Sequence, residues 1–438
     1  MKQAVILAGG MGTRLRERLG DLPKPMIPIG GRPLIEHQLA LCQRHGFLDV
    51  WILAAYRAET IKQFVGDGRR WGVRVQYRVE DERLGTAGAV MQALPSLAVQ
   101  LVVLYGDEMV NVDLDRFWQA HQALQADASL LLHPNDHPFD SDLVEVDPAG
   151  WIRVFHPRPH PPDRFYQNLV NAALYVVNRD SLRPWAGAAP PRDFGRDLFP
   201  AMLAGGRRLQ GYRSPEYIKD IGTPARYDRV CAEYEAGVVQ RGTLRHPQVA
   251  VFLDRDGTLN EETGGVTAPE QLKLLPGVAE AVRALNHHGI RAVVVTNQPF
   301  AAKGLCTEAE LDRIHNKLET LLGREHAFLD RIYYCPHHPD RGFAGERPDL
   351  KVACECRKPK PGLIHRAVRE LNIDLARSWL VGDSTVDLAM ARNCGLRAIL
   401  VRTGHAGRDG RHAAVPDFVF DNLREAVHFI GERTRHTP

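Results

Sequence analysis

The chain has 438 residues, of which 44% are hydrophobic and 25% are charged. This composition is typical of a soluble globular enzyme, and the length predicts two or three domains. The net charge of +3 is too small to indicate a nucleic-acid partner or an anionic membrane, and no apolar run approaches the length of a membrane span.

The order of segments predicts the fold class. Met1-Lys2-Gln3 leads directly into an apolar strand, so we expect no signal peptide and a cytoplasmic protein. The seven cysteines are an odd number, which argues against a disulfide framework in that compartment. Each half alternates strands with helices, which predicts an α/β protein with two Rossmann-like α/β/α domains.

A glycine-rich loop follows the first predicted strand, Ala4–Ala8. It reads Gly9-Gly10-Met11-Gly12-Thr13-Arg14-Leu15, and Pro23-Lys24-Pro25 comes next. Glycines let the backbone approach a phosphate, whose charge Arg14 and Lys24 can neutralise. The loop is not a Walker P-loop, since no Gly-Lys-Ser/Thr follows, and it lacks the third glycine of the dinucleotide fingerprint. Alone it is equally typical of an ordinary turn.

Four further stretches give the loop its meaning. They are a second glycine loop, an apolar strand ending in an acid, a polar-to-aromatic strand, and a second acid before a turn: Leu84-Gly85-Thr86-Ala87-Gly88, Val102-Val103-Leu104-Tyr105-Gly106-Asp107, Asn171-Ala172-Ala173-Leu174-Tyr175, and Asp220-Ile221-Gly222-Thr223-Pro224. Together these motifs resemble the sugar-1-phosphate nucleotidyltransferases over roughly residues 1–235. An unrelated Rossmann-like domain would not predict Gly106-Asp107 and Asp220-x-Gly-Thr-Pro together.

The resemblance implies a nucleotidyltransferase fold and a set of site residues. Asp107 and Asp220 are expected to hold a Mg²⁺ that bridges the nucleotide and sugar phosphates. The nucleotide and sugar phosphate are expected to contact Gly9, Gly10, Gly12, Thr13, Arg14, Lys24, Gly85, Thr86, Gly88 and Asn171.

The join between the halves is polar. Arg226 to Val239 has the composition of a helix, and residues 240–247 are polar with Gly and Pro, as linkers tend to be. We predict domains at 1–235 and 248–438, with a linker at 236–247. No internal repeat is visible, so the two halves indicate a fusion rather than a duplication.

The second half is organised around an apolar strand that ends in two acids, Val251-Phe252-Leu253-Asp254-Arg255-Asp256-Gly257-Thr258. Acids at the carboxyl end of a parallel strand lie where open α/β sheets place their chemistry. Asp254 can attack a phosphoryl group, and Asp256 can give a proton to the leaving oxygen. The alternative is a solvated turn, since Asp-Gly is a common turn dipeptide.

Three later stretches favour chemistry over a turn. Ala292–Val295 is an apolar run ending in Thr296-Asn297-Gln298, whose hydroxyl and amides can hold a phosphate. Arg357 and Lys358 supply two cations for the transferring group. Leu380-Val381-Gly382-Asp383 ends in another acid, with Asp387 four residues on, and Asp383 with Asp254 can hold Mg²⁺.

These motifs in this order resemble the haloacid dehalogenase (HAD) superfamily of phosphatases, from about Pro247 to the C-terminus. The resemblance implies that Asp254 is the nucleophile and Asp256 the general acid and base. The phosphate would contact the side chains of Thr296, Asn297, Arg357 and Lys358. Mg²⁺ would be held by Asp254, Asp383 and the Asp256 carbonyl.

A pair of cysteine motifs lies between the phosphate residues and the last acids. Cys335-Pro336-His337 is followed by Cys354-Glu355-Cys356, and three thiols with one imidazole can close a tetrahedral zinc site. The alternative is scattered buried cysteines, which two tight pairs make less probable. We predict a structural Zn²⁺ held by Cys335, His337, Cys354 and Cys356, with His338 as a competing ligand.

The strings Tyr-Tyr-Cys-Pro-His-His-Pro and Cys-x-Cys-Arg-Lys-Pro narrow the resemblance to D-glycero-D-manno-heptose 1,7-bisphosphate 7-phosphatases and the related histidinol phosphatases. Two loops depart from the heptose enzymes. Pro299-Phe300-Ala301-Ala302-Lys303-Gly304 stands where those enzymes usually have Ser-Gly-Ile-Ala-Arg-Gly. Residues 261–266 lack the Gly-Tyr-Val-His often found there.

Taken together, the resemblances imply a bifunctional enzyme of nucleotide-sugar synthesis. Its second half would hydrolyse the 7-phosphate of a heptose bisphosphate, and its first half would transfer a nucleotidyl group, expected to be GMP from GTP. Its partners would be the sugar bisphosphate, the sugar 1-phosphate and the NTP, without nucleic acid or membrane. The alternatives are a histidinol or other phosphomonoester phosphatase fused to a transferase for another hexose 1-phosphate, or a nucleotide-binding regulatory first half. Oligomeric state is not encoded in any motif.

Overall fold

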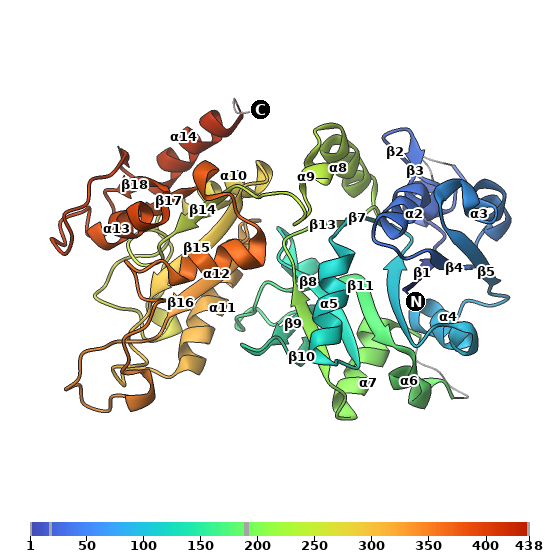
Figure 1. Cartoon of the computed structure of the whole chain (residues 1–438), viewed down its shortest axis with the longest axis horizontal. Helices are drawn as coiled ribbons and strands as arrows, with labels where there is room; N and C mark the ends of the chain where they lie inside the picture. The colour runs from blue at the N-terminus through green and yellow to red at the C-terminus, as the bar shows by residue number, and fades with distance from the viewer. Residues whose placement is uncertain (1, 17–19, 188–191, 436–438) are drawn as a thin grey trace. The chain divides into compact units, whose positions relative to one another are not determined.

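The computed structural model describes residues 2–16, 20–187 and 192–435. The chain divides into two compact units (Figure 1). Unit 1 comprises Met1–His133, Val144–Pro157 and Leu169–Thr243, and unit 2 comprises Pro134–Leu143, Arg158–Asn168 and Leu244–Pro438. Two short segments of the first half are therefore part of unit 2. There, the Tyr166 backbone N–H donates to Thr320 Oγ1 at 2.9 Å.

Unit 1 is built on a nine-stranded mixed sheet. A path of seven strands has the order β10-β9-β11-β6-β1-β4-β5, and β8 pairs with both β11 and β12. The strands are β1 (Gln3–Ala8), β4 (Asp49–Ala54), β5 (Arg74–Val79), β6 (Gln100–Tyr105), β8 (Ala128–His133), β9 (Leu143–Val146), β10 (Ile152–His156), β11 (Val170–Asn178) and β12 (Leu209–Arg213).

The middle of this sheet is buried on both faces. Strand β1 runs parallel to β4 and to β6, and its alternate residues belong to two separate cores. Ala4 and Ile6 pack in one core, and Val5 packs in the other. A strand covered on both faces is continuously apolar, which is why Ala4–Ala8 is recognisable from sequence.

Helices and two short strand pairs complete unit 1. The helices are α2 (Leu34–Arg44), α3 (Ala58–Val65), α4 (Gly85–Ala93), α5 (Leu114–Leu124), α6 (Arg179–Leu182), α7 (Phe199–Ala204), α8 (Pro224–Glu235) and α9 (Val238–Arg241). The short pairs are β2 (Pro28–Ile29) with β3 (Arg32–Pro33), and β7 (Glu108–Asn111) with β13 (Tyr217–Asp220). Because Asp220 pairs with Glu108, it lies beside the neighbouring Asp107.

The end of unit 1 differs from the single helix that we expected over Arg226–Val239. The helix breaks after α8, at Gly237, whose φ of 71° is left-handed and costs little only for glycine. The segment predicted as a linker also contains α9, and the Tyr217 N–H donates to the Gly242 carbonyl at 2.7 Å. This segment is packed against unit 1 up to Thr243, whose hydroxyl donates to Glu216.

Unit 2 has a six-stranded sheet in which all pairs are parallel. Its order is β16-β15-β14-β17-β18-β19 (Figure 1). The strands are β14 (Ala250–Leu253), β15 (Arg291–Asn297), β16 (Arg331–Cys335), β17 (Trp379–Gly382), β18 (Arg397–Val401) and β19 (Phe418–Phe420). The helices are α10 (Val278–His287), α11 (Glu308–Arg324), α12 (Gly362–Leu371), α13 (Thr385–Cys394) and α14 (Leu423–Arg435).

Strand β14 lies inside this sheet and is buried on both faces. Val251 and Leu253 belong to one apolar core, and Ala250 and Phe252 belong to the other. The carboxyl ends of β14, β15 and β17 therefore meet at one edge. The predicted α/β class is confirmed for both units. Among the described residues, no helix combines the length and apolarity needed to span a membrane.

Candidate active sites

The predicted nucleophile of unit 2 lies directly after β14. Asp254 is 8% exposed, and its N–H continues the ladder by donating to the Val381 carbonyl at 3.0 Å. Its carboxylate oxygen Oδ1 accepts from the Arg255 N–H at 2.7 Å and lies 2.7 Å from Lys358 Nζ. Because both contacts go to Oδ1, the second oxygen, Oδ2, takes part in neither of them.

Lys358 joins two of the acids. Its ammonium also donates to Asp387 Oδ1 at 2.7 Å and to the Val295 carbonyl at 3.1 Å. Burial alone would lower the pKa of Lys358, but Asp254 and Asp387 outweigh it and raise this pKa. The side chain is therefore held as a cation in contact with Asp254 and Asp387.

Three carboxylates gather at this point. Asp254, Asp383 and Asp387 each offer an oxygen, and these oxygens lie within 4.8 Å of one another. Burial, and next the Asp387 charge, raises the pKa of Asp254 to about 8. Burial also raises the pKa of Asp383 to about 7, although the His405 N–H donates to it at 2.6 Å. A buried set of hard oxygen donors with excess negative charge fits Mg²⁺.

Two glycines allow the backbone to approach Asp383. A Cβ at Gly257 would lie 2.3 Å from Asp383 Oδ2, and one at Gly404 would lie 2.1 Å from it. Both residues also have positive φ, 76° and 55°, so a side chain there would be strained as well as crowded. These glycines keep the third carboxylate against the Asp-x-Asp-Gly turn.

Asp256 lies two residues further on, and its carboxylate accepts hydrogen bonds from different side chains. Arg255 Nη2 donates to both of its oxygens at 2.9 Å, Asn260 Nδ2 donates to Oδ1 at 2.9 Å, and Gln298 Nε2 donates to Oδ2 at 2.7 Å. Burial works against ionisation, but Arg255 and these hydrogen bonds together lower the pKa of Asp256. The two acids of the motif therefore have opposite environments, which raise the pKa of Asp254 and lower that of Asp256.

The remaining predicted phosphate residues lie at the end of β15 and in the segment after Cys356. Thr296 is buried, and its hydroxyl accepts from Gln298 Nε2 at 3.0 Å. The Asn297 side-chain amide forms two hydrogen bonds with the Lys358 backbone. It accepts from the N–H at 2.9 Å and donates to the carbonyl at 3.2 Å. Arg357 Nη1 donates to the His337 carbonyl at 3.2 Å. Of these four side chains, Lys358 contacts Asp254 directly, Asn297 contacts the Lys358 backbone, and Arg357 contacts the loop of His337.

The cysteine motifs converge as expected from their spacing. Cys356 Sγ lies 3.2 Å from the sulfurs of Cys335 and Cys354 and 3.2 Å from His337 Nδ1, and the Cys335 and Cys354 sulfurs are 3.5 Å apart. Tetrahedral Zn²⁺ with bonds of about 2.3 Å to sulfur requires ligand separations of roughly 3.5–3.8 Å. His338 is outside the cluster, because its Nδ1 lies 3.4 Å from the Asp340 carbonyl. The donor set fits a closed Cys₃His zinc site.

The site of unit 1 is arranged around the first glycine loop. Lys24 forms a salt bridge with Asp107. Its stem passes close to the loop, since a Cβ at Gly10 or Gly12 would lie 3.4 or 3.1 Å from it. Gly12 also has a φ of 63°. Arg14 Nη2 would lie 3.2 Å from a Cβ at Gly222, in the turn that follows Asp220.

The second predicted acid of unit 1 has its own cation. Arg226 Nη1 donates to both carboxylate oxygens of Asp220, at 2.8 and 3.0 Å. The Ile221 N–H donates to the Asp107 carbonyl at 3.0 Å, which ties the two acidic segments together. Asp107 and Asp220 are therefore neighbours, and oxygen donors of this kind fit Mg²⁺.

The second glycine loop of unit 1 begins α4. A Cβ at Gly85 would lie 2.3 Å from the Arg192 carbonyl, and the Thr86 hydroxyl donates to Asp193 at 3.1 Å. Gly88 is buried within the helix, and Asn171 Nδ2 would lie 3.0 Å from a Cβ at Gly195. Thr86 therefore bonds to Asp193 of the same chain. Gly85 and Gly195 allow residues 192–195 to pack closely against α4 and Asn171.

Sequence reasoning missed two residues that contact the predicted acids, Arg255 and Arg226, and one residue, His315, that contacts Arg255. Arg255 was given no role in the sequence analysis, although it is fully buried against Asp256. His315 of α11 reaches Arg255 from 60 positions away, and its only signal was an imidazole on the apolar face of Leu311, Ile314 and Leu318. Arg226 was assigned only to a helix.

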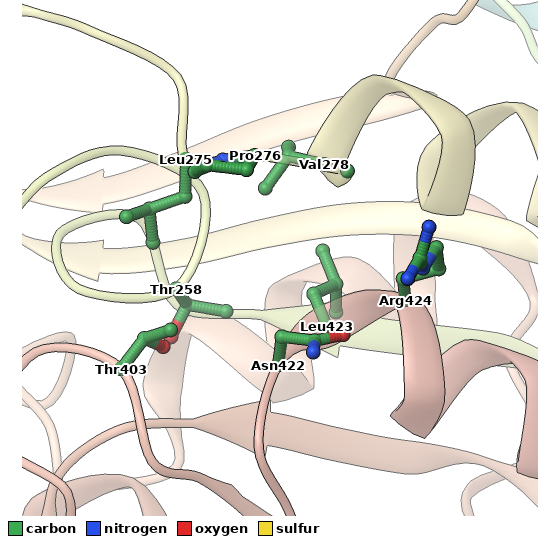
Figure 2. Close-up of a pocket in the computed structure, with 9 residues that line it drawn as sticks. Thr258, Leu275, Pro276, Val278, Thr403, Asn422, Leu423 and Arg424 are labelled. Atoms are coloured by element: carbon green, nitrogen blue, oxygen red, sulfur yellow. The ribbon is translucent and has the colours of Figure 1, made fainter.

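One cavity of unit 2 lies apart from this chemistry (Figure 2). It has a volume of about 290 Å³ and is lined by Thr258, Leu275, Pro276, Gly277, Val278, Thr403, Asn422, Leu423 and Arg424. None of the predicted catalytic or metal residues, all of which the structure describes, is among them. Its walls are mostly apolar, and Arg424 is 3.6 Å from Glu280, so the cavity does not suit a sugar bisphosphate.

Comparison with known proteins assigns the two halves to families. The nucleotidyl transferase family matches residues 3–237, and the HAD-hydrolase-like family matches residues 355–426. The chain is 41% identical over 187 residues to D-glycero-beta-D-manno-heptose-1,7-bisphosphate 7-phosphatase of Yersinia pestis, covering 42% of this chain and 96% of that protein. It is 39% identical over 191 residues to D-glycero-D-manno-heptose-1,7-bisphosphate 7-phosphatase of Thermosynechococcus vestitus, again covering 42% and 96%.

Among solved structures, HddC from Yersinia pseudotuberculosis complexed with GMP-PN is 24% identical, with a TM-score of 0.47, over 53% of this chain and all of that one. The nucleotidyl transferase match includes the first glycine loop of unit 1, and the HAD-hydrolase-like match includes Asp383 and Asp387 of unit 2. The chain therefore belongs to the nucleotidyl transferase family, with a second half that belongs to the HAD-type D-glycero-D-manno-heptose 1,7-bisphosphate 7-phosphatase family.

Proposed function

We propose that the chain is a bifunctional enzyme that makes a nucleotide-activated heptose. Unit 2 removes the 7-phosphate of D-glycero-D-manno-heptose 1,7-bisphosphate, and unit 1 joins the remaining sugar 1-phosphate to a nucleotidyl group. The observation that carries the first activity is the geometry after β14, where Asp254 is fixed through one oxygen and Asp256 lies beside it. The names of the relatives support the choice of sugar.

The phosphatase reaction uses the two acids in turn. Asp254 Oδ2 attacks the phosphorus atom, and the bond from phosphorus to the sugar oxygen breaks as Asp256 gives that oxygen a proton. Asp256 then takes a proton from water, which attacks the phosphoaspartate and releases phosphate. Lys358 stabilises Asp254 as an anion before attack, and Arg357 neutralises charge on the transferring phosphoryl group.

Divalent metal ions complete both sites in this proposal. Mg²⁺ in unit 2 would be held by Asp254, Asp383 and the Asp256 carbonyl, with Asp387 behind them, and would supply charge neutralisation of the phosphoryl oxygens. Mg²⁺ in unit 1 would be held by Asp107 and Asp220. Zn²⁺ at the Cys₃His cluster is structural, because the four ligands leave no position for substrate.

The transferase reaction needs only positioning and charge. An oxygen of the sugar 1-phosphate attacks the α-phosphorus of the NTP, and pyrophosphate leaves. The Gly9–Gly12 backbone, Arg14 and Lys24 surround the phosphates, and the second loop, Gly85–Gly88, lies near the base. We propose GTP as the donor, so that the product is GDP-heptose for cell-surface glycans. Synthesis from NTPs also supports our expectation of a cytoplasmic location.

The order of the two reactions follows from the chemistry. The phosphatase must spare the anomeric phosphate, because the transferase attacks with it. We propose the α-anomer as the preferred substrate, since a guanylyltransferase of this kind uses the α-sugar 1-phosphate. The Yersinia pestis relative is named for the β-anomer, so the anomer is the sharpest point of difference to test.

The two loops that depart from the heptose enzymes contact each other. The Phe300 ring occupies the space beside Gly265, where a Cβ would lie 2.1 Å from Phe300 Cζ. Gly304 similarly approaches the Gly345 carbonyl, 2.0 Å from the position of a Cβ. The changes in the two loops are thus matched to one another.

We also propose domain limits at 1–235 and 248–438.

The test supplies the purified protein with each anomer of the bisphosphate, Mg²⁺ and each NTP in turn, and follows phosphate, pyrophosphate and NDP-sugar. We expect GDP-heptose to appear only after phosphate release, with the α-anomer and GTP preferred. A higher kcat/KM for histidinol phosphate than for either bisphosphate would overturn the phosphatase assignment. Turnover with another NTP but not GTP would overturn the base alone.

A further inference from the structure

The general acid of a phosphatase must point its proton at one atom, and Asp256 has an unusually complete set of contacts for this task. Its Oδ1 accepts from Arg255 Nε at 3.2 Å as well as from Arg255 Nη2 and Asn260, and its Oδ2 accepts from Arg255 and Gln298. The Asp256 side chain is nonetheless 16% exposed. Both oxygens are therefore fixed by the protein, while part of the side chain stays accessible.

Arg255 is not placed to bind substrate. Its side chain is 0% exposed, and its Nη2 lies between Asp256 and Gln298 Oε1, which accepts at 2.9 Å. A guanidinium that is buried and engaged in this way cannot clamp a phosphate in the site. Gln298, which the sequence placed with the phosphate residues, is also fully buried and has its amide turned to Asp256 and Arg255.

Helix α11 provides the far end of this network. His315 Nε2 lies 3.3 Å from Arg255 Nη1, and the His315 ring packs on Tyr334 at a centroid distance of 5.0 Å. Burial, followed by the Arg255 charge, lowers the pKa of His315 to about 3. The imidazole is therefore neutral near pH 7, so Nε2 can accept from the guanidinium instead of repelling it.

We propose that Arg255, Gln298 and His315 are positioning residues that hold the Asp256 carboxyl group in the orientation for proton transfer to the leaving sugar oxygen. The inference rests on the proposed phosphatase activity of unit 2. The planar guanidinium fixes the carboxylate plane, Gln298 fixes the rotation of the guanidinium, and His315 fixes its outer edge. Without them Asp256 is still present but samples other orientations.

The test uses the dependence on the leaving group. An alkyl or sugar phosphate releases an alkoxide that must be protonated, whereas 4-nitrophenyl phosphate releases a stable phenolate that needs no proton. The quantity compared is kcat/KM, because it reports the steps up to formation of the phosphoenzyme and excludes its later hydrolysis. A variant that disturbs proton donation lowers kcat/KM for the alkyl ester and leaves the aryl ester nearly unchanged.

We expect His315→Leu and Gln298→Leu in the full-length chain to lower kcat/KM for the alkyl ester by about tenfold to a hundredfold. The same variants should change kcat/KM for the aryl ester by less than about threefold, taken as the resolution of such comparisons. His315→Gln keeps an acceptor for Arg255 and should restore most of the loss. Leu318→Met, on the same buried face of α11, is the matched control and should change kcat/KM for neither ester.

The outcomes separate the two proposals. A wild-type chain that hydrolyses neither ester would refute the phosphatase assignment itself. A wild-type chain active on both, with folded His315→Leu and Gln298→Leu variants that lose kcat/KM equally on the two esters or on neither, would overturn the positioning role alone. Thermal melting of each variant establishes that it is folded.

Discussion

The two units surround their acidic residues in opposite ways. In unit 1 each predicted metal acid has its own cation, Lys24 for Asp107 and Arg226 for Asp220, and the four side chains are 16–34% exposed. In unit 2 the Lys358 side chain is 3% exposed, and its ammonium is shared between Asp254 and Asp387. Asp383, the third carboxylate, is also buried.

The difference teaches how strongly each site needs a metal ion. Partly exposed ion pairs are screened by water more than buried ones, so the acids of unit 1 can exchange a cationic side chain for a metal at smaller cost. The excess negative charge in unit 2 is buried, where each unpaired carboxylate is costly. Unit 2 should therefore respond to metal and to pH much more than unit 1.

The largest expected effect separates the two sites outright. Asp254→Asn should abolish phosphate release, because an amide cannot form the acyl phosphate. It should leave NDP-sugar formation from a ready sugar 1-phosphate within a few-fold of the wild type. Asp107→Asn should do the reverse. Both activities are followed on the same preparations by phosphate and pyrophosphate release, and joint loss of both in a folded single variant would refute two independent sites.

The next effect concerns the zinc cluster. Cys354→Ser should reduce the zinc content to well below one per chain and destabilise unit 2, because the free energy of metal binding is free energy of folding. Cys356 directly precedes Arg357, so phosphatase activity should fall with it. Cys306→Ser, a cysteine outside the cluster, is the control and should retain zinc. Wild-type protein purified without chelators and found free of zinc would contradict the assignment.

The strands and the order of the acids could be predicted because they depend on local rules. Val251–Leu253 and Leu380–Val381 are continuously apolar since both faces of the parallel sheet are covered. Each run ends in an acid, and parallel strands bring such ends together. The zinc site could also be predicted from the two cysteine motifs, because coordination geometry sets the spacing of metal ligands.

The rest depended on contacts that sequence spacing does not contain. The distance from His315 to Arg255 depends on how α11 packs on the sheet, and nothing local to either residue reports it. Gln298 follows Thr296 and Asn297 in a motif, but the end of β15 turns its side chain inward, under Asp256. The break at Gly237 was missed because the surrounding residues favour a helix, while glycine allows the left-handed turn that ends it.

A smaller effect is a dependence of stability on pH and Mg²⁺. With pKa values raised to about 8 for Asp254 and about 7 for Asp383, the folded chain holds protons that the unfolded chain has released. Stability should therefore fall as pH rises from 6.5 to 8.5 in buffer without Mg²⁺. His315 does not interfere, because its lowered pKa adds stability as pH rises only up to about 6.5, the pKa of an unfolded histidine.

The measurement is thermal melting across that window, without a chelator that would remove zinc. We expect the Tm to fall by about 2–4 °C, the shift that ~1 kcal/mol gives in a domain of this size. Saturating Mg²⁺ should flatten the slope, and Asp254→Asn should flatten it without Mg²⁺. If Tm depends on pH in the same way for the wild type without Mg²⁺, the wild type with Mg²⁺ and Asp254→Asn, these carboxylates are already ionised in the metal-free chain.

The smallest expected effect tests the other side of the comparison. Arg226→Gln removes the cation from Asp220 in a pair whose side chains are 34% and 28% exposed. The loss should cost less than about 1 kcal/mol, because water screens such pairs. The same change frees Asp220 from a competitor for metal, so the Mg²⁺ concentration that half-activates nucleotidyl transfer should fall a few-fold. Phosphate release by unit 2 is the internal control and should keep its Mg²⁺ dependence. A higher Mg²⁺ requirement in the variant would mean that Arg226 orients Asp220 for the metal, and the two sites would then differ less than their charge balance indicates.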